Sequence, residues 1–513
     1  MKINLSLISI LLFNNFLFAN QIPVLTQCNV TLVNNTLEVQ YELSDADNSS
    51  LEVQCILYYG DGSKRNEKVL IKSISGDVGF PVLAGPYKKL VITLEDLADL
   101  NSNIRVLLSA YDREQLDISE LINQVDKSRV YNELALLQGK RNESSDKAFK
   151  DKSRQYITDQ LNSYGYVKAF QSKVGNFSNI NYENSRWGTN DPSSIEIVDA
   201  HYDSYGQAPG ADDNASGVSG VLEIFRILSP YASKKTIRYI LFDLEESGLV
   251  GSNLYVNNQV NPNDKINHVI NFEMIGYYSD QDNTQELPTG FNLLFPEAYN
   301  DVIANNRKGN FITNVGNTAS KSLIALFAQA ASNYVTNLKV ISLEVPGTGT
   351  LVPDLRRSDH ASFWDKGYQA LMITDGANFR NKNYHTPKDS LNYLNMDFLT
   401  NVLKTTIVTL INLAEIEHGT SVEISYAGST YTEQINKNLF TSFQTGNYYK
   451  IIAENEGETY TVKFINLNGE LLYTNIFSKN CEISLDKIAT NGVIFLSLES
   501  KNKKQIKKIF VSH

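Results

Sequence analysis

The chain has 513 residues, of which 42% are hydrophobic and 20% are charged, a balance typical of globular proteins. This length is too great for a single hydrophobic core and predicts about two to four domains. The net charge of -11 and the isoelectric point near 5.2 argue against nucleic acid as a partner, because binding to a polyanion depends on clustered Lys and Arg.

Residues 1–19 are predicted to form a secretory signal peptide. Lys2 precedes an apolar run that ends at the small Ala19, which is typical of exported leaders. A membrane anchor is the alternative, but Asn14 and Asn15 interrupt a run that is already short for spanning a bilayer. No later segment is apolar enough to cross one. We therefore expect a secreted or cell-surface protein, exported through the periplasm, without stable membrane insertion.

Only three cysteines follow this leader: Cys28, Cys55 and Cys481. Cys28 and Cys55 either pair within the first domain or remain free buried thiols, and the sequence leaves both alternatives open. No two cysteines have the spacing of zinc ligands. Any metal site in this chain is therefore expected to use His and carboxylate side chains.

Residues 20–125 are predicted to form a β-sandwich. Short segments of alternating apolar and polar residues recur about every ten residues and are separated by turns. Segment 75–79, together with 88–90 and 106–112, resembles the fibronectin type III-like modules that precede catalytic domains in many secreted bacterial enzymes.

Residues 126–419 alternate between apolar strands and amphipathic helices. This alternation indicates a sheet covered by helices on both faces. The fold class is therefore predicted to be α/β, a three-layer α/β/α sandwich with a mixed central sheet that is flanked by all-β domains. The main predicted strands are 195–198, 236–242, 268–272 and 370–374, and the helices are 218–228, 323–334 and 398–413.

Residues 420–513 return to short strands joined by Asn, Gly and Asp turns, which predicts a second β-sandwich. Its lysines, from Lys501 to Lys508, are interpreted as a solvated strand face rather than a nucleic-acid patch at this overall charge. The tail resembles the C-terminal sorting domain of Bacteroidetes type IX secretion, which implies the type IX secretion machinery as a partner during export. The matching segments are 462–469, 483–488, 491–495 and 506–511.

Acidic and imidazole side chains follow the central-domain strands where each strand ends. Taken singly, such a residue is more often a surface residue or a satisfied core residue. Two neighbouring divalent metals need a bridging carboxylate, terminal His and carboxylate ligands and a base. The chain offers all of these at strand ends although it holds only 6 His. The set is His201, Asp203, Asp213, Glu245, Glu246, Glu273 and His385.

The central domain also resembles a known family. Residues 126–418 are similar to the dinuclear zinc exopeptidase family of secreted bacterial leucyl aminopeptidases, which includes glutamate carboxypeptidase and glutaminyl cyclase. The resemblance implies two Zn2+ ions per chain. The motifs that carry it, in the family's order, are Ala-His-Tyr-Asp-Ser at 200–204, Gly-Ala-Asp-Asp-Asn-Ala-Ser-Gly at 210–217, Glu-Glu-Ser-Gly at 245–248, Ser-Asp-His at 358–360 and Tyr-His-Thr-Pro at 384–387.

The resemblance implies a metal-ligand role for five residues. His201 and Glu273 would complete one zinc site, and Glu246 and His385 the other. Asp213 would bridge both ions. The chain departs from the family pattern at Glu273, where the family's aminopeptidases often carry Asp. The extra methylene of Glu is expected to change the geometry and affinity of the second ion.

Two further roles follow from the same resemblance. Asp203 would hold the other ring nitrogen of His201. Glu245 would be the general base that takes a proton from the metal-bridged water and passes it to the leaving amine. Since the ligand set is then filled, Asp359 and His360 are interpreted as supporting structure.

The sequence thus predicts a secreted zinc exopeptidase, most simply an aminopeptidase that acts on peptides. A glutaminyl cyclase-like acyltransferase and a carboxypeptidase acting on acidic dipeptides are alternatives within the same fold. An inactive surface binding protein is an alternative from another class. Residue preference depends on loops between Tyr277 and Asp354, where no spacing fixes which side chains face a substrate. Arg356 and Arg357 are interpreted as a surface loop, with contact to a substrate carboxylate as the alternative.

Overall fold

The computed structural model divides the chain into two compact units, Met1–Gly428 and Ser429–His513, and each is described by itself. The predicted signal peptide lies outside the described residues. Among the residues described, no helix has the length and apolar character needed to cross a membrane. The described residues are 21–165, 167–175 and 177–428 in the first unit, and 440–445, 448–453, 459–466, 470–478, 480–484, 492–500 and 503–511 in the second.

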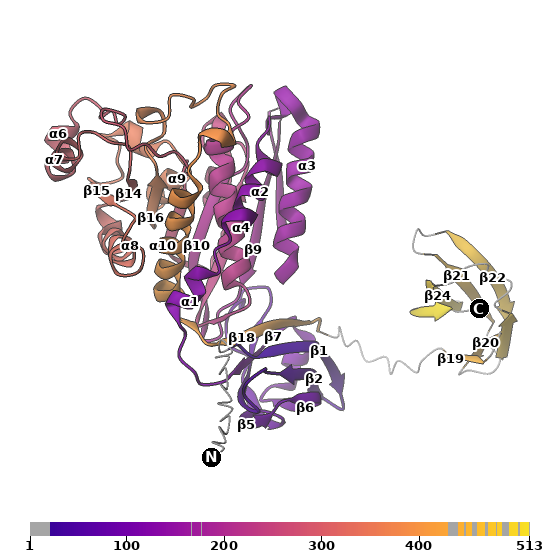
Figure 1. Cartoon of the computed structure of the whole chain (residues 1–513). Coiled ribbons are helices and arrows are strands. Elements are labelled where there is room, and N and C mark those ends of the chain that lie inside the picture. Colours follow the sequence, from indigo (N-terminus) through magenta and orange to yellow (C-terminus); the bar gives the residue numbers. More distant parts are fainter. Residues whose placement is uncertain are drawn as a thin grey trace, which may run out of the picture. The chain divides into compact units, whose positions relative to one another are not determined.

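The first unit contains a β-sandwich of two four-stranded sheets (Figure 1), in the orders β1-β2-β6-β4 and β18-β7-β3-β5. Fully buried side chains from both sheets, such as Val39 and Val106, form one hydrophobic core. The strands are β1 (Val24–Val33), β2 (Thr36–Ser44), β3 (Ser50–Tyr59), β4 (Ile71–Gly76), β5 (Gly79–Leu83), β6 (Gly85–Leu94), β7 (Ile104–Tyr111) and β18 (Gly419–Tyr426).

Strand β18 corrects the predicted boundary at residues 419 and 420. The strand follows the central domain in sequence, yet it pairs antiparallel with β7 along its whole length. Its last residue, Tyr426, packs in the core of the β-sandwich. Alternation locates a strand but does not specify the partner against which it pairs, so the strand's sheet was not visible in the sequence.

The predicted start of the central domain at residue 126 is also too late. Helix α1 (Ile118–Asn123) precedes it, and Leu121 and Ile122 of this helix pack in the core of the central domain. A six-residue helix is too short to show a periodic apolar pattern. The domain therefore begins no later than Ile118.

The three cysteine thiols are free. Burial raises the pKa of Cys28 to about 11 and that of Cys55 to about 12. Both are protonated at neutral pH and therefore unreactive. Of the two alternatives that the sequence left open, the structure has the free thiols.

The central domain is built on an eight-stranded sheet in the order β15-β14-β16-β13-β10-β12-β9-β8. Four neighbouring strands, β16, β13, β10 and β12, run parallel, whereas β9 is antiparallel to β12 and β14 is antiparallel to β16. The predicted mixed sheet is therefore confirmed. The strands are β8 (Lys168–Val174), β9 (Phe177–Arg186), β10 (Asp191–His201), β12 (Lys235–Phe242), β13 (Lys265–Phe272), β14 (Ile312–Asn317), β15 (Val340–Val345) and β16 (Gln369–Thr374).

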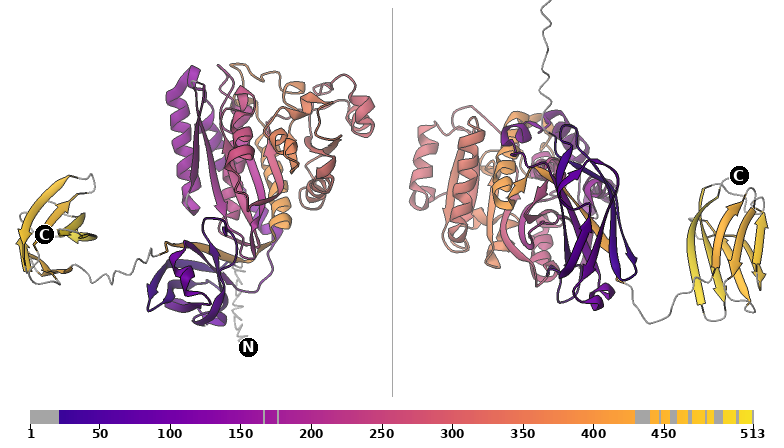
Figure 2. Two further views of the ribbon diagram at one scale, coloured as in Figure 1. Left: turned by 180° about the vertical axis from the view of Figure 1, so that it is seen from behind. Right: turned by 90° about the horizontal axis from the view of Figure 1, so that it is seen from below.

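Helices cover both faces of this sheet (Figure 2), which completes the predicted three-layer α/β/α fold. Side chains of β12 alternate between the faces: Tyr239 and Leu241 enter one core, and Ile240 and Phe242 the other. The first face carries α2 (Lys127–Leu137), α3 (Glu143–Leu161), α4 (Gly217–Leu228), α8 (Lys321–Tyr334) and α10 (Met396–Ala414), and the second carries α5 (Val250–Leu254), α6 (Phe291–Leu294), α7 (Pro296–Ala304) and α9 (His360–Asp365).

The second unit is also a β-sandwich, with sheets in the orders β19-β20-β23 and β22-β21-β24-β25. Ile451 and Ile483 from the first sheet share a core with Tyr460 and Val462 from the second. The described strands are β19 (Phe440–Thr445), β20 (Tyr448–Ala453), β21 (Tyr460–Ile465), β22 (Leu471–Phe477), β23 (Asn480–Ser484), β24 (Gly492–Ser500) and β25 (Lys503–Val511). The role of this unit in secretion stays a prediction.

Candidate metal centre

The parallel strands bring the predicted site residues to one edge of the sheet. His201 is the last residue of β10, directly beside Phe242 of β12, and the preceding Ala200 is beside Phe272 of β13. Glu245 follows the end of β12 and Glu273 the end of β13. The carboxyl ends of parallel strands are where open α/β sheets place their chemistry, and here three functional side chains meet for that reason.

Asp213 reaches the same place through a tight loop. It lies in the turn Ala211–Ser216, which leads into helix α4. Gly210 starts this turn with φ of 59°, and an added Cβ would lie 2.2 Å from the carbonyl oxygen of Asp213. Only glycine fits this position. The Gly-rich loop that follows His201 therefore positions the carboxylate as well as the helix.

The two oxygens of Asp213 face two different imidazoles. Its Oδ1 is 3.4 Å from Nε2 of His201, and its Oδ2 is 3.1 Å from Nε2 of His385. Glu273 Oε2 is 3.3 Å from the same His201 nitrogen, and Glu246 Oε2 is 3.1 Å from the same His385 nitrogen. All five predicted ligands thus come together as two adjacent triads that share Asp213.

This arrangement fits two zinc ions. Zinc bonds of about 2.0–2.1 Å in tetrahedral geometry separate ligand atoms by about 3.3–3.4 Å, close to the spacings within both triads. The ring nitrogens of His201, Nε2 of His385 and Oε1 of Glu246 are buried and have no hydrogen-bond partner among the described residues. Buried polar atoms without partners are costly, and a metal ion at each triad would satisfy Nε2 of His201 and Nε2 of His385.

Glu245 lies beside the first triad but farther from its centre. Its Oε2 is 3.9 Å from Nε2 of His201, compared with 3.3 Å for Glu273. The carboxylates of Glu245 and Glu273 and the His201 ring nevertheless form one group of donor atoms within 4.8 Å of one another. The longer separation favours a base next to the metal over a ligand for Glu245.

Carboxylates outnumber cations at this edge, and the pKa values show the imbalance. Burial, together with the charges of Glu273 and Glu246, raises the pKa of Glu245 well above its usual value. Burial and the neighbouring Asp213 do the same for Glu246. Burial opposes a charge on His201, but the surrounding carboxylates outweigh it and raise the pKa of its ring. A bound cation would relieve this repulsion among the carboxylates.

Asp203 lies where its predicted role would place it, and it makes a second contact. Its Oδ1 is 3.4 Å from Nδ1 of His201, on the ring edge opposite the triad. The same carboxylate accepts hydrogen bonds from the backbone N–H groups of Glu245, at 3.0 Å, and Glu246, at 3.2 Å. One side chain thus orients a candidate ligand and holds the turn that carries the candidate base. The second role was not predicted, since a sequence does not show which turn faces Asp203.

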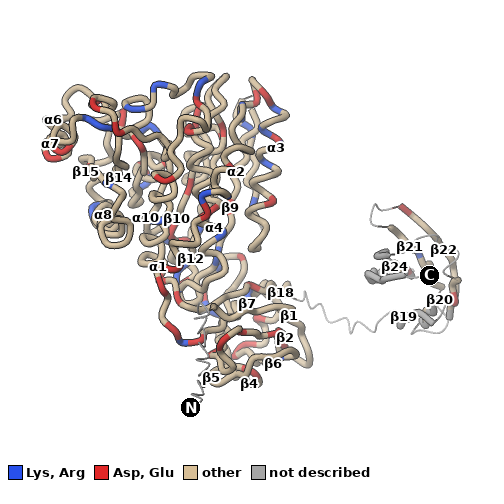
Figure 3. The backbone as a smooth tube through the Cα atoms, in the orientation of Figure 1, with Lys and Arg blue, Asp and Glu red and all other residues tan. Residues whose placement is uncertain are grey.

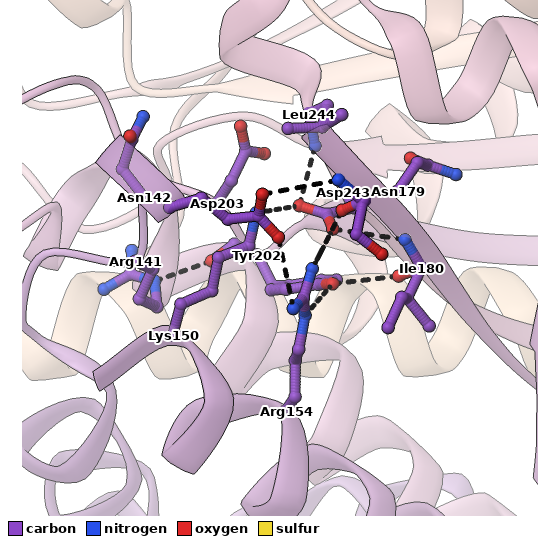
Figure 4. A network of polar contacts seen from close by, with 12 residues as sticks. Arg141, Asn142, Lys150, Arg154, Asn179, Ile180, Tyr202, Asp203, Asp243 and Leu244 are labelled. Atoms are coloured by element: carbon purple, nitrogen blue, oxygen red, sulfur yellow. Dashed lines mark hydrogen bonds and ion pairs between the residues drawn. The ribbon is translucent and has the colours of Figure 1, made fainter. Parts of the chain in front are cut away.

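Behind this turn lies a buried ionic cluster that the sequence reasoning missed (Figure 4). Asp243 forms ion pairs with Nζ of Lys150 at 2.6 Å and with Nη2 of Arg154 at 2.7 Å, and it accepts a hydrogen bond from the N–H of Leu244 at 2.9 Å. Arg154 also donates to the hydroxyl of Tyr202 at 2.9 Å. Lys150 and Arg154 share the helix face of buried Ile157, and this spacing was the available signal.

The loop after β16 holds the other side of the site. Asp389 accepts hydrogen bonds from the backbone N–H groups of Asp212, at 3.0 Å, and Asp213, at 3.1 Å. His385 is stacked between Tyr205, at 3.9 Å between ring centroids, and Tyr384, at 3.7 Å. These contacts fix the Asp213 carboxylate and the His385 imidazole relative to each other.

The Ser-Asp-His segment supports the centre from outside the two triads. Ser358 donates a hydrogen bond of 2.7 Å to Oε2 of Glu273. His360 contacts the carbonyl of Leu355 through Nε2, at 2.9 Å, and Asp359 belongs to neither donor group. Arg357, predicted as a surface-loop residue, donates to the hydroxyl of Tyr384 at 2.8 Å and so lies next to the stacked rings.

The fold and the site define a class: an α/β/α domain with two His-carboxylate triads joined by one carboxylate. Comparison with known proteins agrees, because residues 185–410 match the model of peptidase family M28. This range contains every predicted site residue.

Three curated relatives illustrate the similarity. The chain is 33% identical over 230 residues to an uncharacterized protein, YfbL, of Escherichia coli strain K12, covering 42% of this chain and 66% of that protein. It is 28% identical over 247 residues to a probable zinc metalloprotease of Pyrenophora tritici-repentis, covering 44% and 50%. It is 46% identical over 83 residues to aminopeptidase YwaD of Bacillus subtilis strain 168, covering 16% and 18%. The matched segments thus span about two thirds of the first relative and half or less of the other two.

These matches support the zinc exopeptidase family for the central domain, as the sequence resemblance predicted. They also support zinc as its metal and a zinc-dependent peptidase as its class. The number of ions, the direction of cleavage and the substrate belong to the proposal that follows.

Proposed function

We propose that this chain is a zinc-dependent exopeptidase, an aminopeptidase that removes N-terminal residues from peptides. The observation that carries the proposal is the Asp213 carboxylate, whose two oxygens face His201 and His385 separately. A carboxylate shared between two triads supports two ions per chain. Glu245 stands beside them in the position that a base requires.

The ligands divide as the sequence predicted. His201 and Glu273 would hold one ion, Glu246 and His385 the other, and Asp213 both. When bound, the two zinc ions would polarise the scissile carbonyl and lower the pKa of a water molecule to a value near neutrality. The longer side chain of Glu273 still reaches His201 to 3.3 Å, which supports a complete first site despite the departure from Asp.

Glu245 would move the proton. Its carboxylate takes a proton from the attacking water and returns it to the nitrogen of the leaving amine. The hydrogen bond from its backbone N–H to Asp203 fixes where that carboxylate stands. Such fixed placement of an acid–base group contributes typically about 10²–10⁴-fold to rate.

We further propose that the protein acts outside the cytoplasm. The apolar leader at residues 1–19 supports export, and the C-terminal β-sandwich, with its resemblance to type IX sorting domains, supports that route. The substrates would then be extracellular peptides.

The test is hydrolysis of leucine p-nitroanilide by the purified chain, before and after chelation with 1,10-phenanthroline and after zinc is restored. The expected result is release of p-nitroaniline that chelation abolishes and zinc restores. N-acetyl-leucine p-nitroanilide should not be cleaved, because an aminopeptidase requires a free N-terminus. Cleavage of the blocked substrate, or of C-terminal residues only, would contradict the proposal.

The same preparation separates the alternatives. Cyclisation of a peptide with N-terminal Gln, without cleavage, would indicate a glutaminyl cyclase-like acyltransferase. Absence of turnover on every substrate, with zinc bound, would indicate a binding protein.

A further inference from the structure

A cavity of about 1040 Å³ lies where the β-sandwich meets the central domain. Strands β7 and β18 contribute to its walls from one side, and the end of β9 and the start of β8 from the other. At the end of β9, Arg186 lies beside Ile237 at the start of β12, whereas the candidate metal centre follows the other end of β12. The cavity is therefore separate from that centre, and its role goes beyond the proposed function.

The charge of the cavity differs from that of the chain as a whole. Acidic and basic residues are interspersed along the first unit (Figure 3), and the chain has a net charge of -11. The cavity walls instead carry four cations and two carboxylates. The cations are Arg65, Arg105, Lys168 and Arg186, and the carboxylates are Asp61 and Glu423.

Two of these cations form no ion pair, although the Glu423 carboxylate acts on both at longer range. Arg65 is 4.0 Å from Asp264, and Lys168 is 3.5 Å from Glu183. By contrast, the described residues place no carboxylate within ion-pair distance of Arg105 or Arg186. Arg186 donates only to backbone carbonyls, those of Tyr164 and Ser421, each at 3.0 Å.

Arg105 is the more deeply buried of the two, with 5% of its surface exposed. Its Nη2 donates to Oδ1 of Asn66, but Nε and Nη1 have no hydrogen-bond partner in the described part of the chain. Burial lowers the pKa of Arg105 only to about 10, so the group stays charged at neutral pH. A buried guanidinium with free N–H groups favours an anion that can accept from two of them.

The remaining walls are partly apolar. The exposed side chain of Val24 lines the cavity, and Trp187 stacks against Arg105 with its ring centroid 3.7 Å from the guanidinium carbon. The volume lies slightly above the range of about 300–1,000 Å³ that is usual for small-molecule sites. The cavity therefore offers a cationic end and an apolar wall to one ligand.

We propose that this cavity binds a small organic anion. Its carboxylate, phosphate or sulfate group pairs with Arg105 and Arg186, and its apolar part lies against Val24 and Trp187. The seam between the two domains is thus a ligand site, with residues supplied by both.

The tryptophan in the cavity allows a direct test on the full chain. The sequence has 2 Trp, and only Trp187 lines the cavity. Octanoate, octyl phosphate, octanamide and inorganic phosphate are titrated while intrinsic fluorescence is followed. We expect a saturable change with octanoate or octyl phosphate, and the tighter of the two identifies the head group. The change should disappear in Trp187→Phe, and octanamide and inorganic phosphate should bind at least tenfold more weakly.

Two substitutions with opposite effects sharpen the test. Arg105→Gln should weaken binding of the anion at least tenfold, whereas Glu423→Gln should tighten it about threefold, because it removes a carboxylate from the wall. Arg113→Gln is the matched control: this arginine lies in the same β-sandwich, pairs with Glu52 and does not line the cavity, so affinity should not change.

Three results would overturn the proposal. They are the absence of any saturable change, equal binding of octanamide and octanoate, and unchanged affinity in both Arg105→Gln and Glu423→Gln. Peptide hydrolysis by each preparation reports on the metal centre separately, so the two proposals fail independently.

Discussion

Two buried charged clusters lie close together in the central domain and differ in how they are neutralised. Asp243 is fully buried and has two cations of the chain itself, Lys150 and Arg154, at 2.6 and 2.7 Å. At the candidate metal centre, Asp213, Glu246 and Glu273 face two imidazoles whose Nε2 atoms have no hydrogen-bond partner among the described residues. The first cluster is complete without a ligand, whereas the second is arranged to receive cations.

This difference separates structural from functional burial. A buried carboxylate that the chain itself neutralises contributes to stability, and its removal should act on folding. Removal of a buried carboxylate whose charge the chain leaves uncompensated should instead affect metal binding or turnover. The substitutions below test this division, in order of decreasing expected effect.

Glu245→Gln should reduce kcat by about 10²–10⁴-fold, because the amide cannot accept a proton. Zinc content should stay at the wild-type value, since Glu245 is farther from His201 than the ligands are. Steady-state kinetics on leucine p-nitroanilide and metal analysis of the same sample give both values. A wild-type rate would remove Glu245 from the role of base, and lost zinc would make it a ligand.

Lys150→Met should lower the free energy of unfolding by about 1.5–3 kcal/mol, because it removes one of the two cations that are paired with the buried Asp243. Urea denaturation followed by circular dichroism measures it. Lys147→Met is the matched control on the same helix: Lys147 forms a surface pair with Asp151, and such pairs contribute about 0–1 kcal/mol. Equal effects of the two substitutions would contradict the division.

Asp203→Ala should weaken zinc binding about 10–100-fold, since it removes the group that orients His201. It should also lower kcat at saturating zinc, because the turn that carries Glu245 loses two hydrogen bonds. Competition with a fluorescent zinc chelator, followed by kinetics at saturating zinc, separates the two effects. A loss confined to affinity would show that Asp203 does not position the base.

Glu133 is a buried carboxylate that a cation of the chain neutralises only in part. Its protonation predicts an effect of pH on stability. Burial raises the pKa of Glu133 to about 7, although Arg129 partly opposes this. Between about pH 4.5 and pH 7 the folded chain therefore holds a proton that the unfolded chain has lost, so stability falls as the pH rises through this range. Glu133→Gln should remove about 1–2 kcal/mol of that fall. Urea denaturation at pH 4.5 and pH 7.5 measures it, and an unchanged difference would contradict the assignment.

The sequence predicted the residues of the site better than it predicted the contacts that hold those residues in place. His201, Glu245 and Glu273 lie at or just after the ends of apolar segments whose type and length identify strands, and parallel strands bring their carboxyl ends together. The contacts of Asp203 with the Glu245 turn, and of Asp389 with Asp213, depend on loop conformations that have no periodic signal. The same limit applies to β18, whose alternation was visible but whose pairing with β7 was not.

Metal content is the measurement that tests the central claim most directly. The wild-type chain, Asp213→Asn and Lys150→Met are purified in parallel and analysed for zinc by mass spectrometry. The shared carboxylate predicts two zinc ions per wild-type chain, loss of both in Asp213→Asn, and two in Lys150→Met wherever that variant is folded. One ion in the wild type, or two retained in Asp213→Asn, would contradict a centre bridged by Asp213.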